Sequence, residues 1–253
     1  MLWLLVRRRP VWGAGIASTV AGFILQVFAL GKGPLAVVQL VILMELPFTL
    51  IGAWLVLGGR LQVREWSAIV AMTAGLVVML FTLAPTGGDP FSADPRAWLI
   101  GLTVTVALIL GLVIMGQRRS PAARTALFGV AAGAASGLIA VLAKAVAVAF
   151  KGGALSVITI WQTWALIAAS IGAFLLLQNA LQAGRLVASQ PGITLANPAI
   201  ALAWGIALFH EHINTGWWLI GAGAGITLIA GGAVLLSRSP LLARQHQGSE
   251  SDN

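Results

Sequence analysis

The sequence contains no cysteine and no tyrosine, and it has few charged residues. Without cysteine the chain can form neither a disulfide framework, nor a thiolate nucleophile, nor a cysteine-ligated metal site. Only 9% of the 253 residues are charged and 59% are hydrophobic, whereas a soluble domain carries about 25% charged residues. This composition excludes an ordinary soluble domain and predicts a protein that crosses a membrane several times.

Apolar runs fill most of the chain, and short connections separate them. A helix needs about 20 mostly apolar residues to cross a bilayer. The expected fold class is therefore an all-α polytopic membrane protein, a bundle of about eight transmembrane helices. The polar residues 239–253 predict a disordered tail. The predicted spans cover residues 10–30, 34–57, 65–84, 96–116, 122–150, 155–183, 188–209 and 216–237.

The basic residues are distributed unequally between the two sides of the predicted bundle. The net charge of +8 would suggest a nucleic-acid partner in a soluble protein, but here the charges lie in short loops and indicate topology. Eleven arginines belong to one side, three basic residues to the other, and Lys144 lies inside a span. The positive-inside rule then predicts a plasma-membrane protein with both termini in the cytoplasm, surrounded by lipid and without a nucleic-acid partner.

An internal repeat relates two parts of the chain. Loop charges predict that the copies, residues 1–118 and 119–238, run in opposite directions through the membrane. Inverted repeats with interrupted helices indicate a substrate site near the membrane midplane. The first copy lacks a counterpart of the span 122–150, so we expect a missing opening helix, and nine spans if the true start lies upstream. The residues that recur 151 positions apart are Gln39 and Gln190, Pro47 and Pro198, and Trp66 and Trp217.

The predicted span 34–57 contains two residues that a simple spanning helix would lack. Glu45 places a carboxyl group near the middle of the hydrocarbon, where a charge costs a few kcal/mol or more. Pro47 removes a backbone donor and frees the carbonyl of Leu43. These residues predict a protonatable, interrupted helix that faces a cavity. The alternative is a structural Glu45 that is neutral or paired with a lysine, and Lys144 is the candidate partner unless it extends to the membrane surface.

Polar residues at membrane depth in other spans are candidates for the same cavity. Pro198 frees the carbonyl of Thr194 and is expected to break its helix as Pro47 does. Amide side chains at this depth suit a small polar or cationic solute, or they join helices through hydrogen bonds worth about 0.6 kcal/mol each. The candidate lining residues are Gln26, Gln39, Gln178, Gln190 and Asn197.

Three other patterns have simpler explanations. The GxxxG steps at 129–137 and 221–225 predict close helix packing, within the chain first and in a homodimer as the alternative. His210, Glu211 and His212 do not have metal-site spacing, so we expect them to contact lipid headgroups or to sense pH at an outer gate. No P-loop, GxSxG or dinucleotide-binding motif is present. We therefore expect neither an enzyme nor a cofactor.

The two copies of the repeat resemble a known family. The runs VQLVILMELPFTLIGAWLVLGGRLQVREW (38–66) and ASQPGITLANPAIALAWGIALFHEHINTGWW (188–218) resemble the drug/metabolite transporter superfamily in its EamA-like branch, as does SGLIAVLAKA (136–145). In that family a proline-bearing helix is followed by a short loop, often Gly-Glu-Arg, and then by a Trp-opened helix. Here the loop reads Gly59–Arg60 in one copy and His210–Glu211 in the other.

The resemblance implies a secondary transporter that moves a small metabolite or drug by alternating access, often with proton coupling. Glu45 would then respond to protons or cations, and Pro47 and Pro198 would interrupt the helices around the site. Three alternatives stay open: a magnesium transporter similar to the NIPA type, a non-transporting membrane scaffold or accessory subunit, and a lipid flippase.

Overall fold

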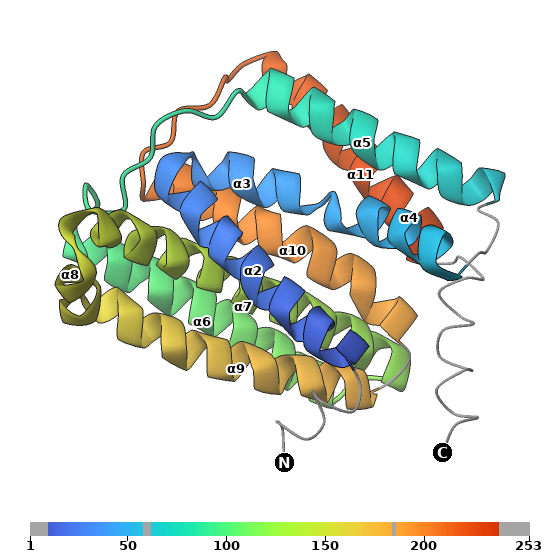
Figure 1. Cartoon of the computed structure of the whole chain (residues 1–253), viewed down its shortest axis with the longest axis horizontal. Coiled ribbons are helices and arrows are strands. Elements are labelled where there is room, and N and C mark those ends of the chain that lie inside the picture. Colours follow the sequence, from blue (N-terminus) through green and yellow to red (C-terminus); the bar gives the residue numbers. More distant parts are fainter. Residues whose placement is uncertain (1–9, 58–61, 184–185, 238–253) are drawn as a thin grey trace.

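The computed structural model describes residues 10–57, 62–183 and 186–237, and every long element in them is an α-helix (Figure 1). Helices occupy all eight predicted spans, and the predicted tail 239–253 lies outside the described residues. The elements are α2 (Pro10–Lys32), α3 (Leu35–Ile42), α4 (Glu45–Leu57), α5 (Val63–Leu83), α6 (Pro95–Gln117), α7 (Pro121–Ala149), η1 (Phe150–Gly152), α8 (Ala154–Thr159), α9 (Trp161–Ala183), α10 (Leu186–Ala207) and α11 (Trp218–Ser237).

The helix composition is that of a multi-pass membrane protein. Six helical stretches in the described chain are long and apolar enough to cross a bilayer, namely those at α3–α4, α5, α6, α7, α9 and α11. The other two predicted spans, α2 and α10, contain the shorter apolar stretches Ala17–Lys32 and Gly192–Ala207.

Helix α7 forms the centre of the bundle and contacts α2, α6, α9 and α10. Of its apolar stretch, 72% is buried, compared with 11% for α6 and for α9, which lie at the periphery. Its many alanines and glycines allow neighbouring backbones to approach closely. A Cβ atom at Gly133 or Gly137 would lie 2.6 or 2.7 Å from the carbonyl oxygen of Ile193 or Asn197 on α10. The prediction that this GxxxG pattern packs helices within the chain is confirmed.

Helices that the predicted internal repeat matches to each other are in contact. The Trp-opened helices α5 and α11 lie side by side (Figure 1), and a Cβ atom at Gly75 would lie 2.7 Å from the carbonyl oxygen of Gly225. Helix α3, the first half of the predicted span 34–57, also contacts α10, the helix of the predicted span 188–209. The helices that the predicted repeat matches to each other are therefore neighbours in the fold.

The two prolines have different effects on their helices. The first proline helix is interrupted at Leu43 and Met44, one turn before Pro47, so the predicted break is confirmed there. Helix α10 continues through Pro198, so the second predicted break is wrong. A proline removes one hydrogen bond, and α10 is held at this level by tight packing, since a Cβ atom at Gly137 would lie 2.8 Å from Cβ of Ile200.

Candidate functional site

Two loops that lie at one end of the bundle are joined to each other. The loop after α5 and the loop after α10 form an isolated antiparallel bridge between Thr86 and His212, with N–O distances of 3.0 and 2.9 Å. The Asp89 amide also donates to the Phe209 carbonyl at 3.1 Å. In the second loop His210 adopts a left-handed backbone conformation, with φ of 57°. Both His210 and His212 are exposed, whereas Glu211, which lies between them, is buried.

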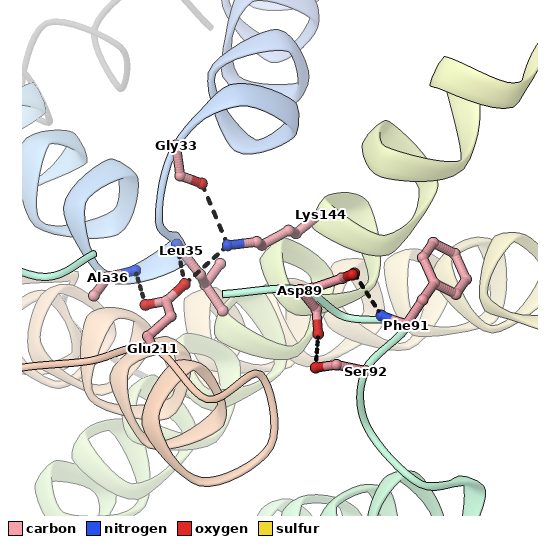
Figure 2. Close-up of polar contacts among 8 residues, drawn as sticks. All are labelled: Gly33, Leu35, Ala36, Asp89, Phe91, Ser92, Lys144 and Glu211. Atoms are coloured by element: carbon pink, nitrogen blue, oxygen red, sulfur yellow. Dashed lines mark hydrogen bonds and ion pairs between the residues drawn. The ribbon is translucent and has the colours of Figure 1, made fainter. Parts of the chain in front are cut away.

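The carboxylate of Glu211 is fully buried and contacts Lys144 and two backbone N–H groups (Figure 2). Its Oε1 atom lies 2.8 Å from Nζ of Lys144 and also accepts from the backbone N–H of Leu35. Its Oε2 atom accepts from the N–H of Ala36 at 3.1 Å. The exposed fractions of the Lys144 and Glu211 side chains are 2% and 0%. We call this group of residues, Lys144, Glu211, Leu35 and Ala36, the Lys144–Glu211 cluster.

Helix α3 presents its N-terminus to this carboxylate. The first N–H groups of a helix have no partner inside the helix, and the helix dipole favours a negative charge beside them. Pro34 precedes α3 and provides no side-chain cap. Glu211, far away in sequence, supplies the missing acceptor for Leu35 and Ala36, and it is therefore stabilised by a helix N-terminus as well as by a lysine.

Lys144 has two further contacts besides the carboxylate. Its Nζ atom donates to the carbonyl of Gly33 at 3.3 Å and lies 5.8 Å from the centre of the Phe209 ring. Phe209 in turn packs against Trp98 and Trp204, with ring centroids 5.5 and 6.3 Å away. The cation therefore lies beside a carboxylate, a carbonyl and the aromatic ring of Phe209, and this environment compensates for the loss of water around it.

Two glycines leave the space that the Glu211 side chain occupies. A Cβ atom at Gly88 would lie 2.7 Å from Oε1 of Glu211, and one at Gly205 would lie 2.5 Å from Oε2. Gly88 also has a backbone φ of 93°, which residues that carry a side chain rarely adopt. The cluster thus connects the α2–α3 turn, α7, the end of α10 and both joined loops.

A second polar position lies within the bundle, on α3. Gln39 is 1% exposed, and neither its side-chain oxygen nor its nitrogen has a hydrogen-bond partner. On the contacting helix α10, Oδ1 of Asn197 is also buried without a partner. Gln39 stands in α3 between Leu35, which belongs to the core around α7, and Leu43, which belongs to the core between α5 and α11. We call Gln39 and Asn197 the amide pair.

The other predicted site residues lie elsewhere. Glu45 begins α4 and is exposed, and the lysine that the sequence suggested as its partner, Lys144, is paired with Glu211 instead. Gln26 on α2 is half-buried and Gln178 on α9 is exposed. The side chain of Gln190 lies outside the part of the chain whose side chains are described. In the described residues, no group of three or more His, Cys, Asp or Glu side chains could hold a metal ion.

Sequence reasoning missed the role of Glu211 but contained the signal for it. Glu211 stands where the resembling family often has Gly-Glu-Arg, and Lys144 belongs to the resembling segment 136–145. The sequence shows each of these residues in a recognisable segment. It does not show that they pair, because 66 residues lie between them and the sequence predicts a surface loop at Glu211.

Comparison with known proteins identifies an uncharacterized bacterial relative. No family model matches the chain, and no solved structure matches it. An uncharacterized protein of Corynebacterium glutamicum is 29% identical over 234 residues, which cover 91% of this chain and 80% of that protein. The chain is thus a multi-pass membrane protein with a homologue in Corynebacterium glutamicum.

Proposed function

We propose that the protein is a secondary transporter that moves a small polar metabolite or drug across the plasma membrane by alternating access. The packing of matching repeat helices, α3 on α10 and α5 on α11, supports this proposal, because inverted repeats carry transport sites at their interface. The interrupted helix α3–α4 supports it as well. The resemblance to the EamA-like drug/metabolite transporters points to the same activity.

The observation that carries the proposal is the unpartnered amide of Gln39. Burying a polar group without a hydrogen bond costs about 1–3 kcal/mol, and a leucine of similar size would avoid that cost. In a bundle with no function beyond its own stability, leucine at position 39 would therefore be more stable than glutamine. Because the amide has both a donor and an acceptor, and Asn197 offers a further acceptor from α10, the amide pair suits a solute that presents hydrogen-bonding groups of both kinds.

The Lys144–Glu211 cluster is the proposed gate at its end of the bundle. Opening that end would separate the α3 N-terminus and the loop after α10 from α7, and each of these segments is held by the cluster. The buried charges favour the closed arrangement while water is excluded, and entering water would solvate them when the gate opens. In this proposal the described structure is the state that is closed at this end.

Glu45 is proposed to couple transport to protons or cations. It lies at the helix interruption, where it is exposed rather than paired. An ionised carboxylate is costly in contact with acyl chains, so we infer that water reaches this part of α4 during transport. Protonation of Glu45 would then change the charge beside the interruption between α3 and α4.

Uptake by the purified protein in proteoliposomes tests the proposal. The solutes are offered in pools of amino acids, nucleosides, organic cations and Mg²⁺, and the Gln39→Leu variant is compared with Gln178→Leu, which replaces an exposed glutamine. We expect uptake from one pool, at least tenfold reduced by Gln39→Leu and unchanged by Gln178→Leu. If folded protein transports nothing from any pool and co-purifies with a partner instead, the scaffold alternative replaces the proposal.

A further inference from the structure

An apolar groove of about 440 Å³ lies between α2, α7 and α9, away from the amide pair. Its walls include Ile24 and Phe28 of α2, Ala143 and Ala147 of α7, and Leu166 of α9. The volume is within the range of about 300–1,000 Å³ that is typical of ligand sites. Ile24 and Phe28 are 48% and 58% exposed. Because these helices belong to a membrane protein, the surrounding solvent at this groove is lipid.

Two lysines close one end of this groove. Lys32 is in the last turn of α2, and Lys151 is in η1 directly after α7. Both are exposed, and neither has an ion-pair partner among the described residues. The lining of the groove contains no carboxylate. Lysines at helix C-termini also interact favourably with the helix dipole, but that effect does not explain why two lysines from different helices meet at one groove.

Basic residues are few at this end of the bundle. Three lysine and arginine residues lie in helical turns next to the loops at the end of the bundle that holds the Lys144–Glu211 cluster, namely Lys32, Arg96 and Lys151. Two of the three line this single groove. An apolar channel that ends in two cations matches the chemistry of an amphiphile with an anionic head, since lysines near the membrane surface attract anionic lipids.

We propose that the groove binds an anionic phospholipid, with one acyl chain along α2 and α7 and the phosphate between Lys32 and Lys151. The site is independent of the proposed transport activity. It adjoins the gate, because Lys32 precedes Gly33, whose carbonyl accepts from Lys144, and Ala143 precedes Lys144 itself. A bound lipid would hold α2 against α7 at this point.

Lipid binding to the purified, delipidated full-length protein tests the proposal. Fluorescent phosphatidylglycerol and phosphatidylcholine are titrated in mild detergent, and bound lipids are counted by native mass spectrometry. With a contribution of about fivefold per lysine, we expect phosphatidylglycerol to bind at least tenfold more tightly than phosphatidylcholine. The double variant Lys32→Gln/Lys151→Gln should reduce this preference to about twofold or less. Arg96→Gln, which removes the third cation of this end, should leave the preference intact.

Two further measurements separate the lipid from other occupants. Val146→Trp places a large side chain in the groove and should weaken the binding of both lipids, with folding verified by the thermal unfolding midpoint. Millimolar inorganic phosphate should not displace phosphatidylglycerol, because the acyl chain contributes to binding. Equal affinities for the two lipids, an effect of Arg96→Gln as large as that of the lysine pair, displacement by phosphate, or a lipid-free dimer that covers the groove would each overturn the proposal.

Discussion

Nζ of Lys144 lies 2.8 Å from Oε1 of Glu211, and the two side chains are 2% and 0% exposed. Removal of one member of a buried ion pair leaves the other charge without compensation, which costs about 3–5 kcal/mol. Replacement of both members by neutral groups is often nearly neutral, because the desolvation penalty disappears with the charges. The pair is therefore predicted to show strong energetic coupling.

Lys144→Met should lower the free energy of unfolding by about 3–5 kcal/mol, since it strands the Glu211 carboxylate beside only two N–H groups. Lys144→Met/Glu211→Gln should recover most of this loss, because a glutamine oxygen can still accept from Leu35 or Ala36. Thermal and denaturant unfolding in detergent measure both variants. Lys151→Met, at an exposed lysine, is the matched control and should change little. A double variant as unstable as the single one would contradict the predicted coupling.

Gly205→Ala should displace the Glu211 side chain, because the new methyl group would lie 2.5 Å from Oε2. We expect a loss of stability of about 1–3 kcal/mol, the range for overpacking. Gly223→Ala is the control, since a Cβ atom there meets nothing within 4 Å, and alanine in a helix should stabilise by up to about 1 kcal/mol. The unfolding midpoints of the two variants should therefore shift in opposite directions. Equal shifts would show that the space at Gly205 is not required.

Gln39→Leu should keep or raise stability while it abolishes transport. The leucine removes an unpartnered buried amide, whose burial costs about 1–3 kcal/mol, and it adds apolar contact between the two cores. The unfolding midpoint and the uptake rate are measured on the same preparation. A purely structural glutamine would behave in the opposite way, with reduced stability and unchanged uptake, and that result would remove the main support for the proposed solute site.

Glu45→Gln should make uptake insensitive to pH without unfolding the protein, because Glu45 is exposed and pairs with no lysine in the described structure. Uptake is followed in proteoliposomes with and without a pH gradient. Asp94→Asn is a control that neutralises an exposed carboxylate at the start of α6. If Glu45→Gln retained full and equally pH-dependent uptake, another group would have to carry the coupling.

The sequence by itself determined the membrane class, the helix content and the positions of the spans. Apolar runs separated by polar turns leave little choice, because backbone groups in lipid must be hydrogen-bonded within a helix. The GxxxG steps also predicted close helix packing, and the contacts of Gly133, Gly137 and Gly225 confirm it. The break before Pro47 followed from the missing backbone donor.

Only the tertiary structure decided which way the polar side chains face. In helices that are apolar on every side, periodicity does not distinguish a face toward the core from a face toward lipid, so Glu45 could not be placed outside and Gln39 inside from the sequence. Tertiary packing also decided that α10 continues through Pro198, because the packing of α10 against α7 outweighs the one hydrogen bond that the proline removes. Glu211 became a buried residue only when two loops joined and carried it to the N-terminus of α3, a position that depends on contacts between segments far apart in the chain.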